Sequence, residues 1–162
     1  MSSVTELERD RAKEAYKYVI DGKKILELNE IYNKNNEYYK DDKYKSYVKK
    51  IPMMILNNGL GATFAFIYSK QKKYDNKKNK KAGERENPKN AYDLIYYQVD
   101  NWLQKSYIKK IKTDKNIPDT YLMNWIVNLN SSEYRTVTNE VLALFNWLKR
   151  FADGMIEGED NA

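Results

Sequence analysis

The chain has 162 residues, no histidine and no cysteine, and 29 Lys and Arg against 23 Asp and Glu, a formal net charge of +6. Without histidine or cysteine it cannot build the usual near-neutral proton shuttle, a thiolate nucleophile, a disulfide or the common zinc sites. A chain of this length forms one hydrophobic core, so we expect a single domain over residues 1–162.

The N-terminal residues are charged and do not resemble a secretory signal. The longest apolar stretch, residues 51–68, contains Pro52 and two asparagines and is shorter than the roughly 20 apolar residues of a membrane-spanning helix. We therefore expect a cytoplasmic protein that has no membrane partner, and we interpret this stretch as a buried helix.

Helical periodicity starts near the N-terminus. Thr5 and Glu8 have the spacing of a capping box. Small and apolar residues then recur at spacings of three and four, at Ala12, Ala15, Val19, Gly22 and Leu26. The pattern predicts a first helix that ends at about Tyr32, followed by a polar, turn-prone segment over residues 33–42.

A helical pattern resumes over residues 44–50, where Pro52 must kink the helix or begin a new one. A second long helix is predicted over residues 51–72. Gly59 and Gly61 in this helix favour the close packing of another helix. They do not make a dinucleotide-binding loop, because the place of the third glycine is Phe64 and no strand precedes them.

The next two helices are expected to open at prolines. Asn87 and Pro88 have the residue types of an N-cap and a first helical position, and the helix is predicted to end near Ile108. Pro118 opens a short helix whose apolar residues are Leu122, Trp125, Ile126 and Leu129.

The last helix has the clearest signals. Asn130 and Glu133 form a second capping-box pattern, and the helix is predicted to end near Gly158. Its apolar stripe consists of Val137, Val141, Leu144, Phe145, Leu148, Phe151 and Met155. We therefore expect an all-α bundle of about six helices, with a frayed acidic tail over residues 157–162.

Residues 70–89 hold nine basic and three acidic residues and almost nothing apolar. This excess equals the net charge, so the remainder of the chain is neutral. The segment is predicted to be a flexible, solvated, lysine-rich loop. Direct contact with nucleic acid is the alternative interpretation. AT-rich coding would also produce frequent Lys, Asn, Ile and Tyr without selection for binding, so both interpretations stay open.

Two stretches interleave tyrosines with lysines, a combination that stacks bases and neutralises phosphates on single-stranded nucleic acid. They lie within residues 38–50 and 92–112. The rings are Tyr38, Tyr39, Tyr44, Tyr47, Tyr92, Tyr96, Tyr97 and Tyr107. Tyrosine also packs between helices with its hydroxyl in water, so core packing is the alternative for each ring.

Catalytic chemistry has little support in the sequence. The carboxylate pairs Asp41 with Asp42, and Asp10 with Glu14 one helical turn apart, have suitable ligands for Mg²⁺. In so charged a chain these pairs are ordinary solvated faces, and two-metal chemistry needs carboxylates from several elements. We expect no cofactor, no metal and no enzymatic activity.

Two blocks of sequence resemble a known family. The first is PMMILNNGLG at residues 52–61, followed by Ala65 and Phe66. The second is SSEYR at residues 131–135, followed by EVLAL and WLKRFA. In this order and over nearly the whole chain, they are similar to the small helical subunit of the type III-B CRISPR RNA-targeting complex, the Cmr complex. Relative to that family, the lysine-rich segment looks like an expanded loop.

The resemblance implies an all-helical, non-catalytic subunit. Copies of it stack beside the guide-binding backbone subunits, near the groove where guide RNA pairs with target RNA, and the backbone and large subunits perform the chemistry. Its implied partners are those subunits, other copies of itself, and guide and target RNA. Because base pairing supplies the sequence recognition, contacts to shape and phosphates suffice. In or beside the blocks, the candidate RNA-binding residues are Lys49, Lys50, Arg135, Lys149 and Arg150.

A DNA-binding regulator is the alternative function. Residues 118–128, a short turn at 129–130 and the polar start of the last helix have the layout of a helix-turn-helix. The length of the last helix argues against it, because its apolar stripe continues through Phe151 as in a core element.

Overall fold

The computed structural model describes residues 4–24, 41–70, 91–105 and 122–157. In these ranges the chain forms six α-helices and no strand, which confirms the predicted all-α bundle. The helices are α1 (Val4–Lys23), α3 (Asp41–Asn58), α4 (Leu60–Lys70), α5 (Ala91–Lys105), α7 (Leu122–Val127) and α8 (Ser131–Met155).

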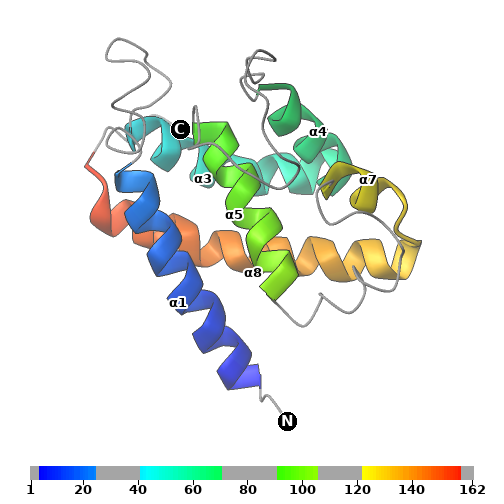
Figure 1. The fold of residues 1–162 in the computed structure, drawn as a ribbon, viewed down its shortest axis with the longest axis horizontal. Helices are drawn as coiled ribbons and strands as arrows, with labels where there is room; N and C mark the ends of the chain where they lie inside the picture. Colours follow the sequence, from blue (N-terminus) through cyan, green and yellow to red (C-terminus); the bar gives the residue numbers. More distant parts are fainter. Residues whose placement is uncertain (1–3, 25–40, 71–90, 106–121, 158–162) are drawn as a thin grey trace, which may run out of the picture.

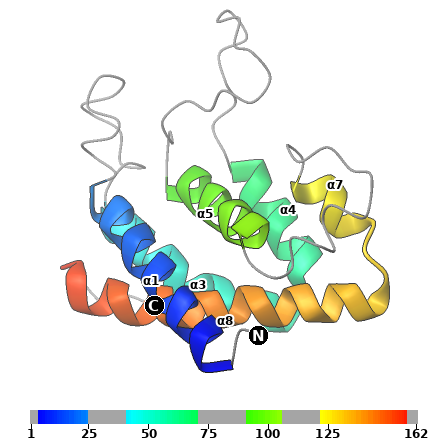
Figure 2. The same ribbon diagram turned by 60° about the horizontal axis from the view of Figure 1, so that its bottom comes forward.

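Helix α8 organises the bundle (Figure 1). It spans the width of the molecule, and its most extensive contacts are with α1, which crosses it, and with α3. In the view of Figure 2, α4, α5 and α7 lie above α8, and α7 lies above its N-terminal end. Among these helices, none is long and apolar enough to cross a membrane.

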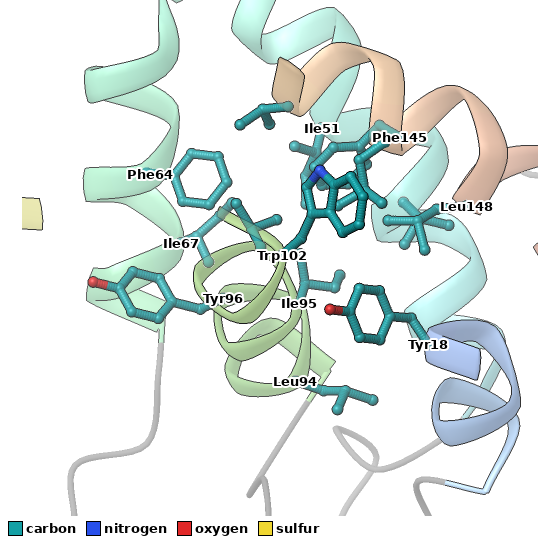
Figure 3. Close-up of a cluster of buried hydrophobic side chains, with 14 of the residues drawn as sticks. Tyr18, Ile51, Phe64, Ile67, Leu94, Ile95, Tyr96, Trp102, Phe145 and Leu148 are labelled. Carbon is teal, nitrogen blue, oxygen red and sulfur yellow. The ribbon is translucent and has the colours of Figure 1, made fainter. Parts of the chain in front are cut away.

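The apolar stripe of α8 was predicted correctly, because it depends only on helical periodicity. Its buried side chains include Val137, Val141, Leu144, Phe145 and Leu148. They pack against rings and aliphatic side chains of the other helices (Figure 3). Examples are the buried side chains of Phe64, Ile95 and Trp102. This single apolar cluster fixes the helices, so the side chains on their outer faces have defined positions.

The break between the second and third described helices was predicted at the wrong residue. Helix α3 continues through Pro52 to Asn58, and the chain turns at Gly59, whose φ is +89°. The left-handed conformation at Gly59 favours glycine, and α3 accommodates Pro52 although proline removes a backbone donor and crowds the carbonyl of residue i−4. The described part of the segment predicted as one helix, residues 51–72, is therefore divided between α3 and α4. Helix α3 begins at Asp41, inside the segment 33–42 that was expected to be a turn.

The two predicted capping boxes have different outcomes. Thr5 lies inside α1, and the Glu8 carboxylate binds side chains rather than the backbone. At α8 the box is present, because the Glu133 backbone N–H donates to Asn130 Oδ1 (2.9 Å) and the Asn130 N–H donates to Glu133 Oε1 (3.1 Å). The helix ends at Met155, three residues before the predicted Gly158.

Asn130→Ala should lower the free energy of unfolding by about 1 kcal/mol, because it leaves an N-terminal N–H of α8 without its acceptor. Urea denaturation followed by circular dichroism measures the change. Asn139→Ala is the control, since Asn139 is exposed in the middle of the same helix. Equal losses in the two variants would contradict the assignment of the cap.

Several predictions fall outside the described residues. They are the first helix beyond Lys24, the lysine-rich segment after Lys70, the start and end of the helix that contains α5, the opening at Pro118, and the tail after Glu157. Of the lysine-rich segment, the structure describes Lys70, which is exposed at the end of α4.

Candidate nucleic-acid interface

Three predicted cations lie along one side of α8 and the neighbouring α3. Arg135, Leu142 and Lys149 are spaced by seven residues, which returns the helix to within about 20° of the same direction at each step. Arg135 and Lys149 are exposed and Leu142 is half-buried. One turn after Lys149, Asp153 Oδ1 is 3.0 Å from Lys49 Nζ of α3, so Lys49 lies beside the same line of side chains.

Helix α3 adds apolar side chains to this surface. Met53 and Leu56 follow Lys49 at positions i+4 and i+7, and they are 59% and 68% exposed. We define the α3–α8 face as Lys49, Met53, Leu56, Arg135, Leu142 and Lys149. It combines cations with exposed aliphatic groups. The exposure of Met53 and Leu56 differs from the buried helix that was predicted for this stretch.

The other two predicted RNA-binding residues lie on different faces. Arg150 lies over the Trp147 ring, with its guanidinium carbon 5.7 Å from the ring centroid. The Trp147 indole N–H donates to Glu8 of α1 (3.2 Å), so this side of α8 faces α1. Lys50 is exposed on α3, one residue and about 100° around the helix from Lys49. Four of the five predicted residues are therefore exposed, Lys49 is half-buried, and the five do not form one patch.

In the part of the first tyrosine–lysine stretch that the structure describes, the rings of Tyr44 and Tyr47 are packed and do not form an open surface for bases. Tyr44 is fully buried, its hydroxyl donates to Gln98 Oε1 (2.7 Å), and burial raises its pKa. Lys45 is only 8% exposed. Tyr47 stacks on Tyr92 with ring centroids 4.0 Å apart. Core packing, the alternative interpretation, is correct for Tyr44, while Tyr38 and Tyr39 lie outside the described residues.

The second stretch is also mostly packed. Tyr96 is buried against Phe64, with ring centroids 6.3 Å apart. Tyr92 is half-buried, and burial raises its pKa to about 12. Tyr97 is 39% exposed, and Tyr107 with the lysines that follow it lies outside the described ranges. Sequence spacing alone did not separate these rings into core and surface.

The two sequence blocks that carry the family resemblance touch each other. The Gly61 backbone N–H of α4 donates to the Tyr134 hydroxyl of α8 (2.7 Å). A Cβ atom at Gly59 would lie 3.3 Å from the same oxygen, and one at Gly61 would lie 3.5 Å from it. The predicted close packing at these glycines is therefore confirmed, and its partners are α8 and, through Ile126, α7.

A buried ion pair that the sequence did not indicate joins α1 to α8. Arg11 donates from Nε to Glu140 Oε1 (3.0 Å) and from Nη2 to Glu140 Oε2 (2.6 Å). The Trp102 indole of α5 also donates to Glu140 Oε1 (2.9 Å). The hydrogen bonds to Glu140 raise the pKa of the Arg11 guanidinium. Glu140 is 1% exposed, so this group holds the core together.

The carboxylates considered as metal ligands are used differently. Glu14 lies 3.4 Å from Lys17 Nζ and 3.6 Å from Lys105 Nζ, and Asp10 is exposed. In the part of the chain that the structure describes, no three Asp or Glu side chains converge as a metal site would require. The side chains of Asp41 and Asp42 are not among the described groups.

The helix-turn-helix interpretation is not supported. Helix α7 has six residues, and α8 continues as one 25-residue helix whose buried stripe extends to Ala152. A recognition helix needs its base-contacting surface free, whereas the contacts of α8 with α1 and α3 commit it to the core.

Comparison with protein families agrees with this architecture. The family model described as CRISPR-associated protein (Cas_Cmr5) matches residues 7–155. The match begins in the first turn of α1 and ends with the last residue of α8, so it extends over all six described helices. The chain therefore belongs to the CRISPR-associated Cas_Cmr5 family, as its two sequence blocks predicted.

Proposed function

We propose that the protein is a non-catalytic subunit of a type III-B CRISPR ribonucleoprotein in antiviral defence. Its copies stack along the guide-RNA filament beside the backbone and large subunits, in the cytoplasm, and contact target RNA through the α3–α8 face. The observation that carries this proposal is the line of Arg135 and Lys149 on α8, joined by Lys49 of α3, on helices that the family match covers.

The spacing of these cations suits a phosphate backbone. Arg135 and Lys149 are 14 residues apart, which places them about 21 Å from each other along a rigid helix. Neither has a carboxylate within ion-pair distance among the described residues, so both retain their charge for an external anion. Lys49 shares its charge with the exposed Asp153, and it is the weakest of the three as a phosphate contact.

A non-catalytic role agrees with the composition of the chain. With no histidine and no cysteine, it lacks the usual near-neutral proton shuttle and a thiolate nucleophile. The proposal assigns RNA cleavage to the partner subunits. Mg²⁺-dependent cleavage of RNA by the purified chain, abolished by changing one carboxylate, would contradict this part of the proposal.

Charge reversal tests the face directly. In the assembled complex, Lys49→Glu, Arg135→Glu and Lys149→Glu together should weaken target-RNA affinity at least tenfold. They should also lower the slope of log affinity against log salt by about 0.7–0.9 for each phosphate that is no longer neutralised. Filter binding at several salt concentrations measures both quantities.

Lys43→Glu is the matched control, because Lys43 is an exposed lysine on another side of α3. Its affinity and salt slope should stay within twofold of the parent complex. Lys50→Glu and Arg150→Glu, made separately, test the two predicted residues that lie on other faces. Unchanged affinity and slope in the triple variant would remove the α3–α8 face from the proposal.

The assembly itself is tested by purifying the tagged protein from its own cells. Backbone and large subunits, together with small guide RNAs, should co-purify with it and be identified by mass spectrometry and RNA sequencing. Recovery of the chain without other CRISPR subunits and without guide RNA would contradict the proposed function as a whole.

A further inference from the structure

A second surface with exposed rings lies where α1 crosses α8. The Tyr16 ring packs edge-on against Phe151, with centroids 5.5 Å apart and an interplanar angle of 83°. Phe151 stacks with Trp147, one turn earlier on α8, at 5.8 Å and 24°. Tyr16 is 49% exposed and the other two rings are half-buried. Three rings from two helices thus make one continuous aromatic surface.

Cations border these rings on both helices. Arg9, Lys13 and Tyr16 follow one another at positions i, i+4 and i+7, so they share one side of α1, and both cations are exposed. On α8, the Arg150 guanidinium lies 5.7 Å from the Trp147 ring centroid. Within the described ranges, no carboxylate lies within ion-pair distance of Arg9, Lys13 or Arg150.

The carboxylate that contacts the Trp147 indole belongs to Glu8. The Glu8 carboxylate accepts from Arg11 Nη1 (2.6 Å) and from the Trp147 indole N–H (3.2 Å). It therefore fixes the indole in place, and it shares the positive charge of Arg11 with Glu140. Arg9, Lys13 and Arg150, which have no ion-pair partner among the described residues, place three cations beside three aromatic rings.

We propose that this α1–α8 face (Arg9, Lys13, Tyr16, Trp147, Arg150 and Phe151) binds unpaired nucleotides of single-stranded RNA. Arg9, Lys13 and Arg150 contact phosphates, and bases stack on the exposed Tyr16 ring and against the Arg150–Trp147 pair. The inference rests on the proposed function in taking RNA as the ligand. It concerns a different side of α8 from the α3–α8 face, and a different state of the RNA.

The chemistry favours single strands over duplex RNA and over a protein partner. Bases in a duplex are stacked on each other and do not offer their faces to side chains, whereas unpaired bases do. Protein interfaces are also enriched in aromatic residues and arginine, but their cores are depleted of lysine and of charged residues as a whole. Half of this face is cationic and none of its members is acidic, so a polyanion complements it better. A single strand supplies both π-faces and regularly spaced phosphates, so it complements rings and cations together.

Tryptophan fluorescence provides a direct test. The chain has three tryptophans, and Trp102 and Trp125 are 3% and 0% exposed, so Trp147 is the one placed to respond to a ligand at the surface. The full-length protein is titrated with a uridine 12-mer and, separately, with a 12-base-pair RNA duplex. We expect the single strand to quench the emission, less quenching as salt rises, and at least tenfold weaker quenching by the duplex.

Three variants locate the signal. Trp147→Phe keeps a ring on Phe151 and should abolish the quenching. Tyr16→Ala removes an exposed ring and should weaken binding about tenfold, as expected when one base has no ring to stack on. Arg150→Gln should lower the salt slope by about 0.7. Lys43→Gln, at an exposed lysine of α3 that belongs to neither face, is the matched control and should leave affinity and slope unchanged.

The inference is overturned if the single strand does not quench Trp147, if quenching persists in Trp147→Phe, or if duplex and single strand bind equally. Protection of Trp147 from acrylamide by the backbone subunits alone, without a response to RNA, would assign this face to a protein neighbour instead. The charge-reversal triple on the α3–α8 face separates the two proposals. If the triple variant binds target RNA as tightly as the parent complex, the proposed function of the α3–α8 face is wrong, but the quenching test still decides the α1–α8 face. If the single strand does not quench Trp147, the α1–α8 proposal is wrong, but the charge-reversal test still decides the α3–α8 face.

Discussion

Glu140→Ala is expected to lower the free energy of unfolding by about 3–5 kcal/mol, the range for breaking a buried ion pair. The substitution removes the carboxylate that accepts two hydrogen bonds from Arg11 and one from Trp102. The Trp102 N–H is then left in the core without its acceptor, and Arg11, which is 11% exposed, keeps only Glu8. Urea denaturation followed by circular dichroism measures the loss.

A double-mutant cycle distinguishes a broken ion pair from a general packing defect. Arg11→Met combined with Glu140→Leu removes both charges and fills their space with apolar groups. It should cost clearly less than the sum of the two single substitutions. Glu157→Ala, at an exposed carboxylate, should change stability by less than about 0.5 kcal/mol. Additive losses in the double variant would contradict the ion-pair explanation.

Gly22→Ala should destabilise the protein by roughly 2–3 kcal/mol, although alanine is the better helix former by about 1 kcal/mol. A Cβ atom at Gly22 would overlap the side chain of Tyr44 at its Cδ1 and Cε1 atoms. That ring cannot move aside, because it is fully buried and its hydroxyl donates to Gln98 (2.7 Å). Thermal and urea unfolding measure the change.

Gly154→Ala is the matched control for this substitution. Gly154 is also in a helix, but no atom lies within 4 Å of the position where its Cβ would be. The same change should therefore stabilise the protein by about 0.5–1 kcal/mol, through helix propensity alone. A stabilising Gly22→Ala would show that α1 and α3 are not packed as closely as described. A smaller loss when Gly22→Ala is combined with Tyr44→Leu would confirm the ring as the cause.

Two predictions that depend on local chemistry are confirmed, whereas the capping box at Thr5 and Glu8 is not formed. The cap at Asn130 involves residues three positions apart, and the stripe of α8 repeats every three or four positions, so both are encoded within one segment. The break between two helices was predicted at Pro52 but lies at Gly59. Sequence rules treat both proline and glycine as helix breakers, and only the fold shows that the chain needs a left-handed backbone at Gly59.

RNA contact by the five proposed cations stays a prediction. Four of them are exposed and Lys49 is half-buried, since long basic side chains keep their charged ends in water. Their division among faces was not predictable, because it depends on which side of α8 each neighbouring helix covers. Lys49 joins Lys149 through Asp153, whereas Arg150 faces α1 with Trp147.

The sequence by itself determined that this protein is helical, that it lacks histidine and cysteine chemistry, and that its two blocks belong to the Cas_Cmr5 family. Periodicity, capping and composition act over a few residues, so they can be read without a fold. The tertiary structure alone decided which tyrosines are core, that Glu140 pairs with Arg11 across 129 positions, and that Tyr16 meets Phe151. These contacts arise only when burial of one shared apolar core brings distant helices together.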